Sequence, residues 1–213
     1  MKTLISLTKK PNKTFKILIY KRVNWANIIT LFSFNGIIII YYLAKLEGLI
    51  SLENKKTTVI SILSIITLGV FYGILSNLLV GYFIKITGKL FKTKNNLIQI
   101  YKAISWSNLP FTILIFVLIL KLLIEKLIAT DISEVTKSFY SILLFTISLI
   151  ELLCISFQLI LLFVGIKIAQ KLSSFKTALN IMAAIIIYYS IFICHKTLPS
   201  LDIFIRFIKY RFF

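Results

Sequence analysis

The chain has 213 residues, of which 59% are hydrophobic and only 15% are charged. A soluble domain is roughly 45–50% apolar and about 25% charged, so this composition excludes a soluble globular protein. Several apolar stretches reach or exceed the roughly 20 residues that a helix needs to cross a bilayer. The composition therefore predicts an all-α fold, a polytopic transmembrane helix bundle whose core is formed by its own spans.

The first 24 residues precede the first apolar stretch and are strongly basic. Lysine and arginine are spread through this segment without an acid, and no apolar run followed by a small-residue cleavage site is present. The segment therefore does not fit a cleavable signal peptide. We expect residues 1–24 to form a basic arm on the cytoplasmic side.

Length and hydropathy predict five membrane spans. They are expected at about 25–46, 58–84, 103–124, 138–165 and 177–195. Residues 25–195 should thus form a five-span membrane bundle, which a C-terminal tail at 196–213 follows.

The charge of the connecting segments alternates along the chain. The 1–24 arm and the loops at 85–102 and 166–176 are basic without an acid, whereas the loops at 45–57 and 121–137 also contain acids. The positive-inside rule places purely basic segments in the cytoplasm, so we expect the N-terminus inside and the C-terminus outside. Most of the net charge of +18 is then an orientation signal and an attraction to anionic lipids, and nucleic acid is not an expected partner.

Two segments have the pattern of amphipathic helices lying in the headgroup plane. Residues 89–104 alternate lysines with apolar residues. In the tail at 196–213, Ser200 can cap a helix that places Asp202 and Arg206 on one face. A frayed terminus is the alternative for the tail.

The stretch Ser-Trp-Ser-Asn-Leu-Pro at 105–110 places helix-interrupting residues directly before the third span. Pro110 lacks a backbone donor and disfavours helix at Leu109, so the span should begin or kink here. Ser107 or Asn108 can cap the exposed amides. Trp106 suits headgroup depth, where an amphipathic indole is at home.

These residues resemble the Yip-domain (Ypt-interacting protein) family in its bacterial type. The family's aromatic-Ser-x-Leu/Ile-Pro signature is matched, with Trp where Tyr is usual, by Trp106, Ser107, Leu109 and Pro110. A second likeness, to the loop between the fourth and fifth spans, lies at Gly165, Ser173, Ser174, Lys176 and Ala178. The resemblance covers about 25–195.

The resemblance implies a protein that acts by binding other integral membrane proteins. For a bacterial member it implies an accessory subunit beside an ABC-type exporter, in peptide-toxin export or in self-protection. The Ile/Lys/Asn-rich composition indicates an AT-rich bacterium, and therefore the bacterial cell membrane. The sequence has no glycine-rich phosphate motif, so a transport role would require a separate ATPase.

Glu151 lies near the middle of the fourth expected span. An ionised carboxylate is costly there, so it should face the bundle, find a partner or stay protonated. We expect a protonated Glu151 that is hydrogen-bonded to Asn77 or Asn35, because no basic residue is expected at the same depth. Partner docking and proton-coupled transport are the alternatives. The residues predicted to share one polar stripe of this helix are Ser141, Ser148, Glu151 and Gln158.

The second expected span carries small or polar residues at a spacing of four. Glycines let two membrane helices approach closely. We expect packing within the chain at this face, with a homodimer or partner interface as the alternative. The residues are Gly69, Gly73, Asn77 and Gly81.

The sequence offers little equipment for catalysis. His195 is the single histidine, and Cys154 and Cys194 lie inside expected spans, so neither a metal site nor a disulfide framework is expected. Protease and hydrolase motifs are absent from the sequence. We therefore expect no catalytic residue and no cofactor, and a non-catalytic accessory or scaffold protein. A small secondary transporter or channel that uses the Glu151 stripe is the alternative, although an inverted repeat and paired acids are lacking.

Overall fold

A computed structural model shows a bundle of helices throughout the residues that it describes, which are 2–46, 55–93, 96–128 and 134–196. Towards some helix ends, including 191–196, only the backbone is described. The expected amphipathic tail at 197–213 lies outside these residues, as do the side chains of Cys194 and His195. The helices are α1 (Lys2–Lys9), α2 (Pro11–Tyr20), α3 (Trp25–Leu46), α4 (Lys55–Lys89), α5 (Leu97–Ser107), α6 (Pro110–Ile128), α7 (Glu134–Gln170) and α8 (Ser174–Lys196).

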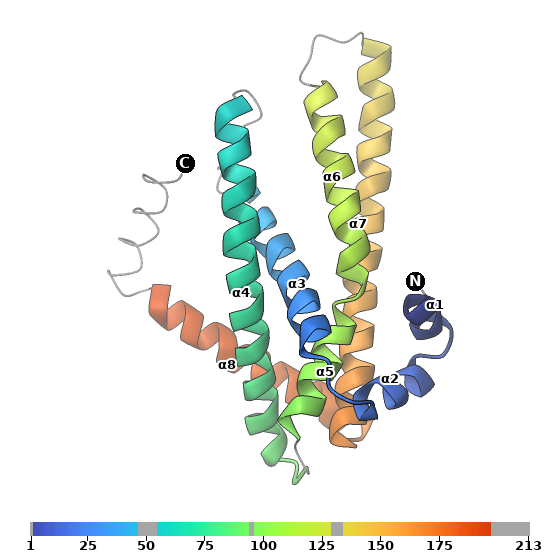
Figure 1. Cartoon of the computed structure of the whole chain (residues 1–213), viewed down its shortest axis with the longest axis vertical. Coiled ribbons are helices and arrows are strands. Elements are labelled where there is room, and N and C mark those ends of the chain that lie inside the picture. Colours follow the sequence, from blue (N-terminus) through green and yellow to red (C-terminus); the bar gives the residue numbers. More distant parts are fainter. Residues whose placement is uncertain (1, 47–54, 94–95, 129–133, 197–213) are drawn as a thin grey trace.

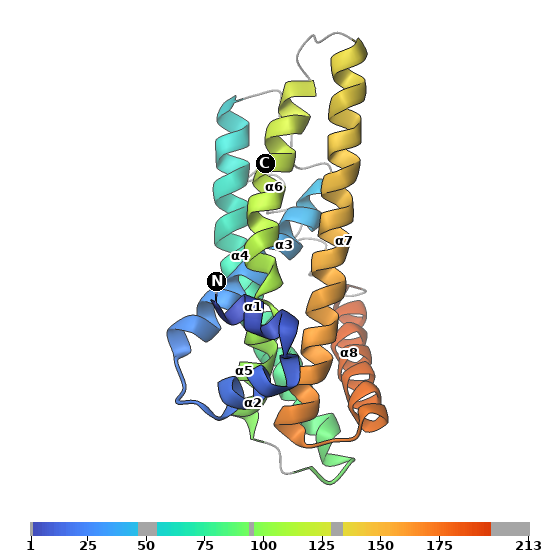
Figure 2. The ribbon, with the colours of Figure 1, turned by 90° about the vertical axis from the view of Figure 1, so that its right-hand side faces the viewer.

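The long helices run side by side along the molecule. In Figures 1 and 2, α3, α4, α6 and α7 form the upright bundle, α5 continues α6 downward, and α8 crosses obliquely near the lower end. Within the described residues, the segments long and apolar enough to cross a membrane are Trp25–Leu46, Ile62–Lys89, Leu97–Glu125 and Ser138–Gln170. The expected all-α polytopic bundle is confirmed, whereas a fifth span within α8 stays a prediction.

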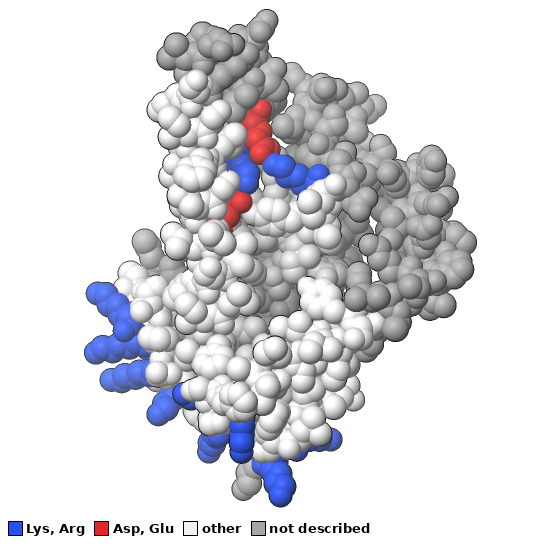
Figure 3. All heavy atoms as spheres, turned by 180° about the vertical axis from the view of Figure 1, so that it is seen from behind, with Lys and Arg blue, Asp and Glu red and all other residues white. Residues whose placement is uncertain are grey.

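The acid-free basic segments gather at one end of the bundle. This end, called the basic end below, is formed by α1, α2 and the C-terminal ends of α4 and α7 (Figure 1). Figure 3 shows lysine and arginine side chains around it. The acid-free segments, which are separate in the sequence, are therefore neighbours in space.

The chain before the first span is helical and packed, which the sequence analysis missed. Leu7 of α1 and Phe15 and Ile19 of α2 are buried in the main core cluster. They lie there together with Ala103 of α5 and Leu161 of α7. Residues 2–20 are thus anchored to the bundle by apolar contacts, while Lys9, Lys10, Lys13 and Lys16 remain exposed.

The predicted interfacial helix over 89–104 is wrong in its bounds and in its setting. Lys89 ends α4 and residues 90–92 form a turn. α5 begins only at Leu97, where the Asn96 side chain accepts a hydrogen bond from the Ile98 amide at 3.0 Å. Ile100 and Ser105 are fully buried, because α5 packs against α7, α4 and α3. It is therefore an internal helix of the bundle.

Lys102 explains part of this difference. Its side chain is buried, and its ammonium group donates hydrogen bonds to the carbonyl oxygens of Ile19 and Lys21 at the end of α2. A helix C-terminus has unsatisfied carbonyls and favours a cation. The lysine that the pattern assigned to the headgroups therefore ties the N-terminal helices to α5.

The predicted helix break before the third span is confirmed, but not the predicted caps. Asn108 and Leu109 form a turn, and Pro110 is the first residue of α6, where its missing N–H costs little. The Ser107 hydroxyl donates to the Ile104 carbonyl at 2.7 Å, and the amide of Phe111 is bonded to the Asn108 backbone oxygen at 3.0 Å. The Asn108 side chain is directed to other helices instead.

The glycines of α4 bring its backbone against that of α3. A Cβ added at Gly36 would overlap the carbonyl oxygen of Gly69, and one added at Gly73 would overlap the carbonyl oxygen of Phe32. Further along α4, Gly81 faces the ring of Tyr101. The structure thus places the glycines of the four-residue spacing in contacts inside the chain.

Gly36→Ala should destabilise the protein strongly, because the new Cβ meets a backbone atom that cannot move without separating α3 from α4. We expect a loss of about 3 kcal/mol or more, measured as thermal unfolding of the purified chain in detergent. Gly81→Ala is the matched comparison, and its loss should be nearer 1 kcal/mol because the Tyr101 ring can shift. Equal losses would contradict the backbone contact.

Candidate functional site

Four charged side chains form two ion pairs between α3, α6 and α7. The Lys121 ammonium group lies 2.9 Å from both carboxylate oxygens of Glu151, with side-chain exposures of 14% and 9%. Lys45 lies 2.6 Å from Glu125, and this pair is more open, with exposures of 41% and 23%. We call these four residues the charge cluster. Figure 3 shows acidic and basic side chains together at this level, well away from the basic end.

The two pairs lie at different depths in the apolar part of the bundle. Lys121 and Glu125 are one turn apart on α6, so the pairs are stacked along that helix. The 16 residues from Glu151 to Lys167 correspond to about 24 Å of helix, whereas the hydrocarbon core is about 30 Å thick. With Lys167 at the surface of the basic end, the Lys121–Glu151 pair lies inside the apolar layer. The Lys45–Glu125 pair lies closer to the opposite surface.

The pairing of Glu151 corrects the sequence analysis. No basic residue was expected at its depth, and Asn77 or Asn35 was the expected partner, but Lys121 binds the carboxylate directly. A third span over about 103–124 would place Lys121 close to the end of that span. In the structure α6 starts from a buried turn at Asn108, which places Lys121 deeper. The Lys121 ammonium group thus compensates a charge that would be costly to bury alone in the bundle.

Two tyrosines of α3 adjoin the Lys121–Glu151 pair. The Tyr41 hydroxyl is buried and has no hydrogen-bond partner within the described part of the chain, whereas the Tyr42 hydroxyl is directed at the Glu151 carboxylate. Both rings are near enough to Glu151 to interact with it electrostatically. A buried hydroxyl without a partner is unfavourable. The cluster therefore has hydrogen-bonding capacity that the described residues leave unused.

Below the charge cluster, amide side chains connect four parts of the bundle. The Asn77 carbonyl oxygen accepts hydrogen bonds from Asn35 at 3.3 Å and from Asn108 at 3.2 Å. The Asn108 carbonyl oxygen accepts one from Gln158 at 3.4 Å. This amide network joins α3, α4, the turn before α6, and α7. Hydrogen bonds of this kind hold helices together where water is absent.

The predicted stripe of α7 does not form one site. Glu151 and Gln158 contact α6 and the turn before it, whereas Ser141 and Ser148 are exposed, and the Ser148 hydroxyl donates to Leu144 of its own helix at 3.0 Å. At 100° per residue the two serines lie about 80° around the helix from the other two residues. The stripe is therefore two neighbouring faces, of which one is covered.

The predicted motif before α6 has a positioning role in the structure. Ser107 and Asn108 are fully buried, and Trp106 and Leu109 pack against the main core cluster. Together with Pro110 they end α5 and start α6 in a fixed register, which directs Lys121 toward Glu151. The sequence analysis missed Lys45, Lys121 and Glu125 as site residues. Opposite charges within neighbouring apolar segments were the signal that could have found them.

The helical fold and its long apolar segments define a polytopic membrane protein. The family model described as the Yip1 domain matches residues 5–195. The chain belongs to this family, as the resemblance predicted. The match includes most of α1 and all of α2, so the N-terminal helices are part of the domain. No curated protein and no solved structure matches the chain significantly.

Lys121→Met should destabilise the protein by about 3 kcal/mol or more, because it leaves the Glu151 carboxylate without its partner in the bundle. The double variant Lys121→Met/Glu151→Leu should lose less than the single variant, since both charges are removed together. Thermal unfolding in detergent measures both.

Lys45→Met provides the control for this comparison. Its pair is partly exposed, so the loss should stay below about 1 kcal/mol. If Lys121→Met behaved like Lys45→Met, the buried pair would not contribute as the structure indicates.

Proposed function

We propose that this Yip1-domain protein is a non-catalytic scaffold that binds another integral membrane protein through the charge cluster. The observation that carries the proposal is the partly exposed Lys45–Glu125 pair, which lies next to the buried Lys121–Glu151 pair on one lateral face of an otherwise apolar bundle. Polar groups within a bilayer are costly unless they are paired. A partner helix with a polar side chain would satisfy them, and such contacts are an established means of helix association.

The two ion pairs have separate parts in this proposal. Lys121 and Glu151 are nearly buried, so they hold α6 against α7 and form the floor of the docking site. Lys45 and Glu125 are accessible, so they provide the contacts to a partner. Family membership supports a binding role, because Yip-family proteins interact with other membrane proteins.

The proposed partner is an ABC-type exporter complex of a bacterial cell membrane, active in peptide-toxin export or in self-protection. This part of the proposal is supported by the resemblance to bacterial members of the family. ATP hydrolysis would then be the partner's, since the sequence has no phosphate-binding glycine motif. In this arrangement the basic end and the N-terminus face the cytoplasm, and a second copy of the chain is the competing occupant of the docking site.

A small transporter is the second candidate, favoured by a carboxylate and a lysine within the apolar layer. The packing of α7 weighs against it. Between Gln158 and Gln170 the helix buries Leu161 and Ile166 in the main core cluster, together with Phe15 of α2. This stretch of 12 residues is about 18 Å long, and its apolar packing separates the two polar regions. Glu151→Gln in proteoliposomes tests the candidate, because loss of a proton-coupled flux would support transport.

Exchanging the charges of the accessible pair, in the variant Lys45→Glu/Glu125→Lys, should abolish partner binding without unfolding the chain. The internal ion pair can still form, but the pattern of charge that the partner meets is reversed. The measurement is a tagged pull-down from native membranes in mild detergent, read by mass spectrometry. We expect a stoichiometric membrane protein with the wild type and at least a tenfold loss with the exchange variant, about 1.4 kcal/mol.

The control variant removes charge at the other end of the molecule. Lys92→Gln/Lys171→Gln/Lys176→Gln should retain the partner. Recovery of the wild-type chain with lipid alone would contradict a stable complex. Retention of the partner by the exchange variant would contradict docking at the charge cluster, and recovery of an untagged second copy would identify a homo-oligomer.

A further inference from the structure

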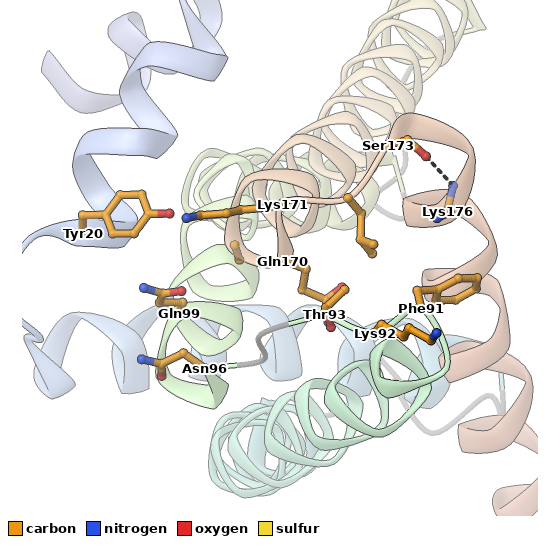
Figure 4. Close-up of a pocket in the computed structure, with 12 residues that line it drawn as sticks. Tyr20, Phe91, Lys92, Thr93, Asn96, Gln99, Gln170, Lys171, Ser173 and Lys176 are labelled. Atoms are coloured by element: carbon orange, nitrogen blue, oxygen red, sulfur yellow. Dashed lines mark hydrogen bonds between the residues drawn. The ribbon is translucent and has the colours of Figure 1, made fainter.

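A cavity of about 550 Å³ opens at the basic end of the bundle. Figure 4 shows that its walls come from the C-terminal ends of α4 and α7, from α2 and from the start of α5. Its size is within the range of small-molecule sites, about 300–1,000 Å³. Lys176 at the start of α8 also lines it. Five parts of the chain that are separate in sequence therefore meet around one cavity.

Among the described residues, the lining of the cavity contains three lysines and no acid. Lys92, Lys171 and Lys176 line it, and none of the three forms an ion pair within the described residues. In Figure 4, Lys171 extends toward Tyr20 on one side of the cavity, while Lys92 lies on the other side. The acidic side chains of the charge cluster are at a different level of the bundle (Figure 3). The cavity therefore has an uncompensated positive charge.

Two of these lysines occupy an unusual backbone position. Lys92 and Lys171 have φ angles of 56° and 55°, in the left-handed region that glycine adopts most easily. The Leu172 amide bonds to the Lys167 carbonyl at 3.2 Å, so Lys171 is at the helix-ending position where glycine is common. Both helix ends thus present a lysine side chain at the cavity where a glycine would be conformationally easier.

The remaining polar groups of the lining can add hydrogen-bond donors. Tyr20 and Gln99 line the cavity, and the side-chain carbonyl of Asn96 already accepts the Ile98 amide, which leaves its NH₂ group to donate. Ammonium groups with neutral hydrogen-bond donors beside them suit an anion that has several acceptor oxygens. Phosphate has this chemistry, and lipid phosphates lie at the level where membrane-spanning helices end.

We propose that this cavity binds the phosphate group of an anionic phospholipid from the leaflet at the basic end. The site is distinct from the proposed docking site, because it uses none of the residues of the charge cluster. A phosphate between Lys171, Tyr20 and Lys92 would join α2 to α7 and α4. The lipid would thereby hold the N-terminal helices against the bundle.

The test is native mass spectrometry of the full chain in mild detergent with added phosphatidylglycerol. Wild-type protein should retain phosphatidylglycerol in preference to zwitterionic phosphatidylcholine. Lys92→Gln/Lys171→Gln/Lys176→Gln should weaken phosphatidylglycerol binding about tenfold or more, because each lysine near a lipid phosphate contributes separately. The matched control is Lys9→Gln/Lys13→Gln/Lys16→Gln, which removes the same charge from exposed positions of α1 and α2 and should change binding less than about twofold.

Thermal unfolding separates the possible sources of phosphate. Phosphatidylglycerol should raise the melting temperature of the wild type, and this shift should be lost in the cavity variant but not in the control variant. Equal losses in both variants would overturn the proposal, since attraction would then depend on total charge alone. Stabilisation by inorganic phosphate without stabilisation by phosphatidylglycerol would overturn the assignment to a lipid.

Discussion

The position of α6 depends on one buried turn. Asn108 ends α5, and its side chain is held by Asn77 of α4 and by Gln158 of α7, while Pro110 starts the next helix with its φ angle fixed. Because a helix is a rigid element, a register set at this turn is transmitted along α6 to Lys121, about 19 Å further on at 1.5 Å per residue. The ion pair with Glu151 thus depends on the amide network below it, and the outer Lys45–Glu125 pair depends on the same helix.

A buried ion pair is weak evidence for stability, because desolvation offsets much of the attraction between the charges. In this protein the Lys121–Glu151 pair specifies how α6 packs against α7. Apolar contacts alone would let α6 slide or rotate against α7, whereas one lysine and one carboxylate permit a single register. The same argument applies to a partner helix, which gains little from apolar contact in lipid but can be selected by charge and hydrogen bonding. Two regions of the bundle then differ in chemistry. The basic end has lysines, and the charge cluster has paired charges.

The sequence predicted those parts of the structure that depend on local chemistry. Apolar length located four of the five predicted spans, Pro110 located the helix break, and the residues around Trp106 indicated the family. The pairing of Lys121 with Glu151 could not be read in the same way, because it depends on how deep the turn at Asn108 lies. The N-terminal helices were missed for a similar reason. Their lysines are a strong local signal, whereas the burial of Phe15 depends on contacts with Ala103 and Gly165 that only the folded chain provides.

We infer that the lateral face around the charge cluster is a docking site for another membrane protein. Site-specific photo-crosslinking in native membranes tests it most directly, with the reactive residue at Leu46, which is 84% exposed beside Lys45. The comparison position is Leu75 of α4, which is 61% exposed. We expect a discrete protein crosslink from Leu46 and none from Leu75. Crosslinks to lipid alone from both positions, or the same protein from both, would contradict the account.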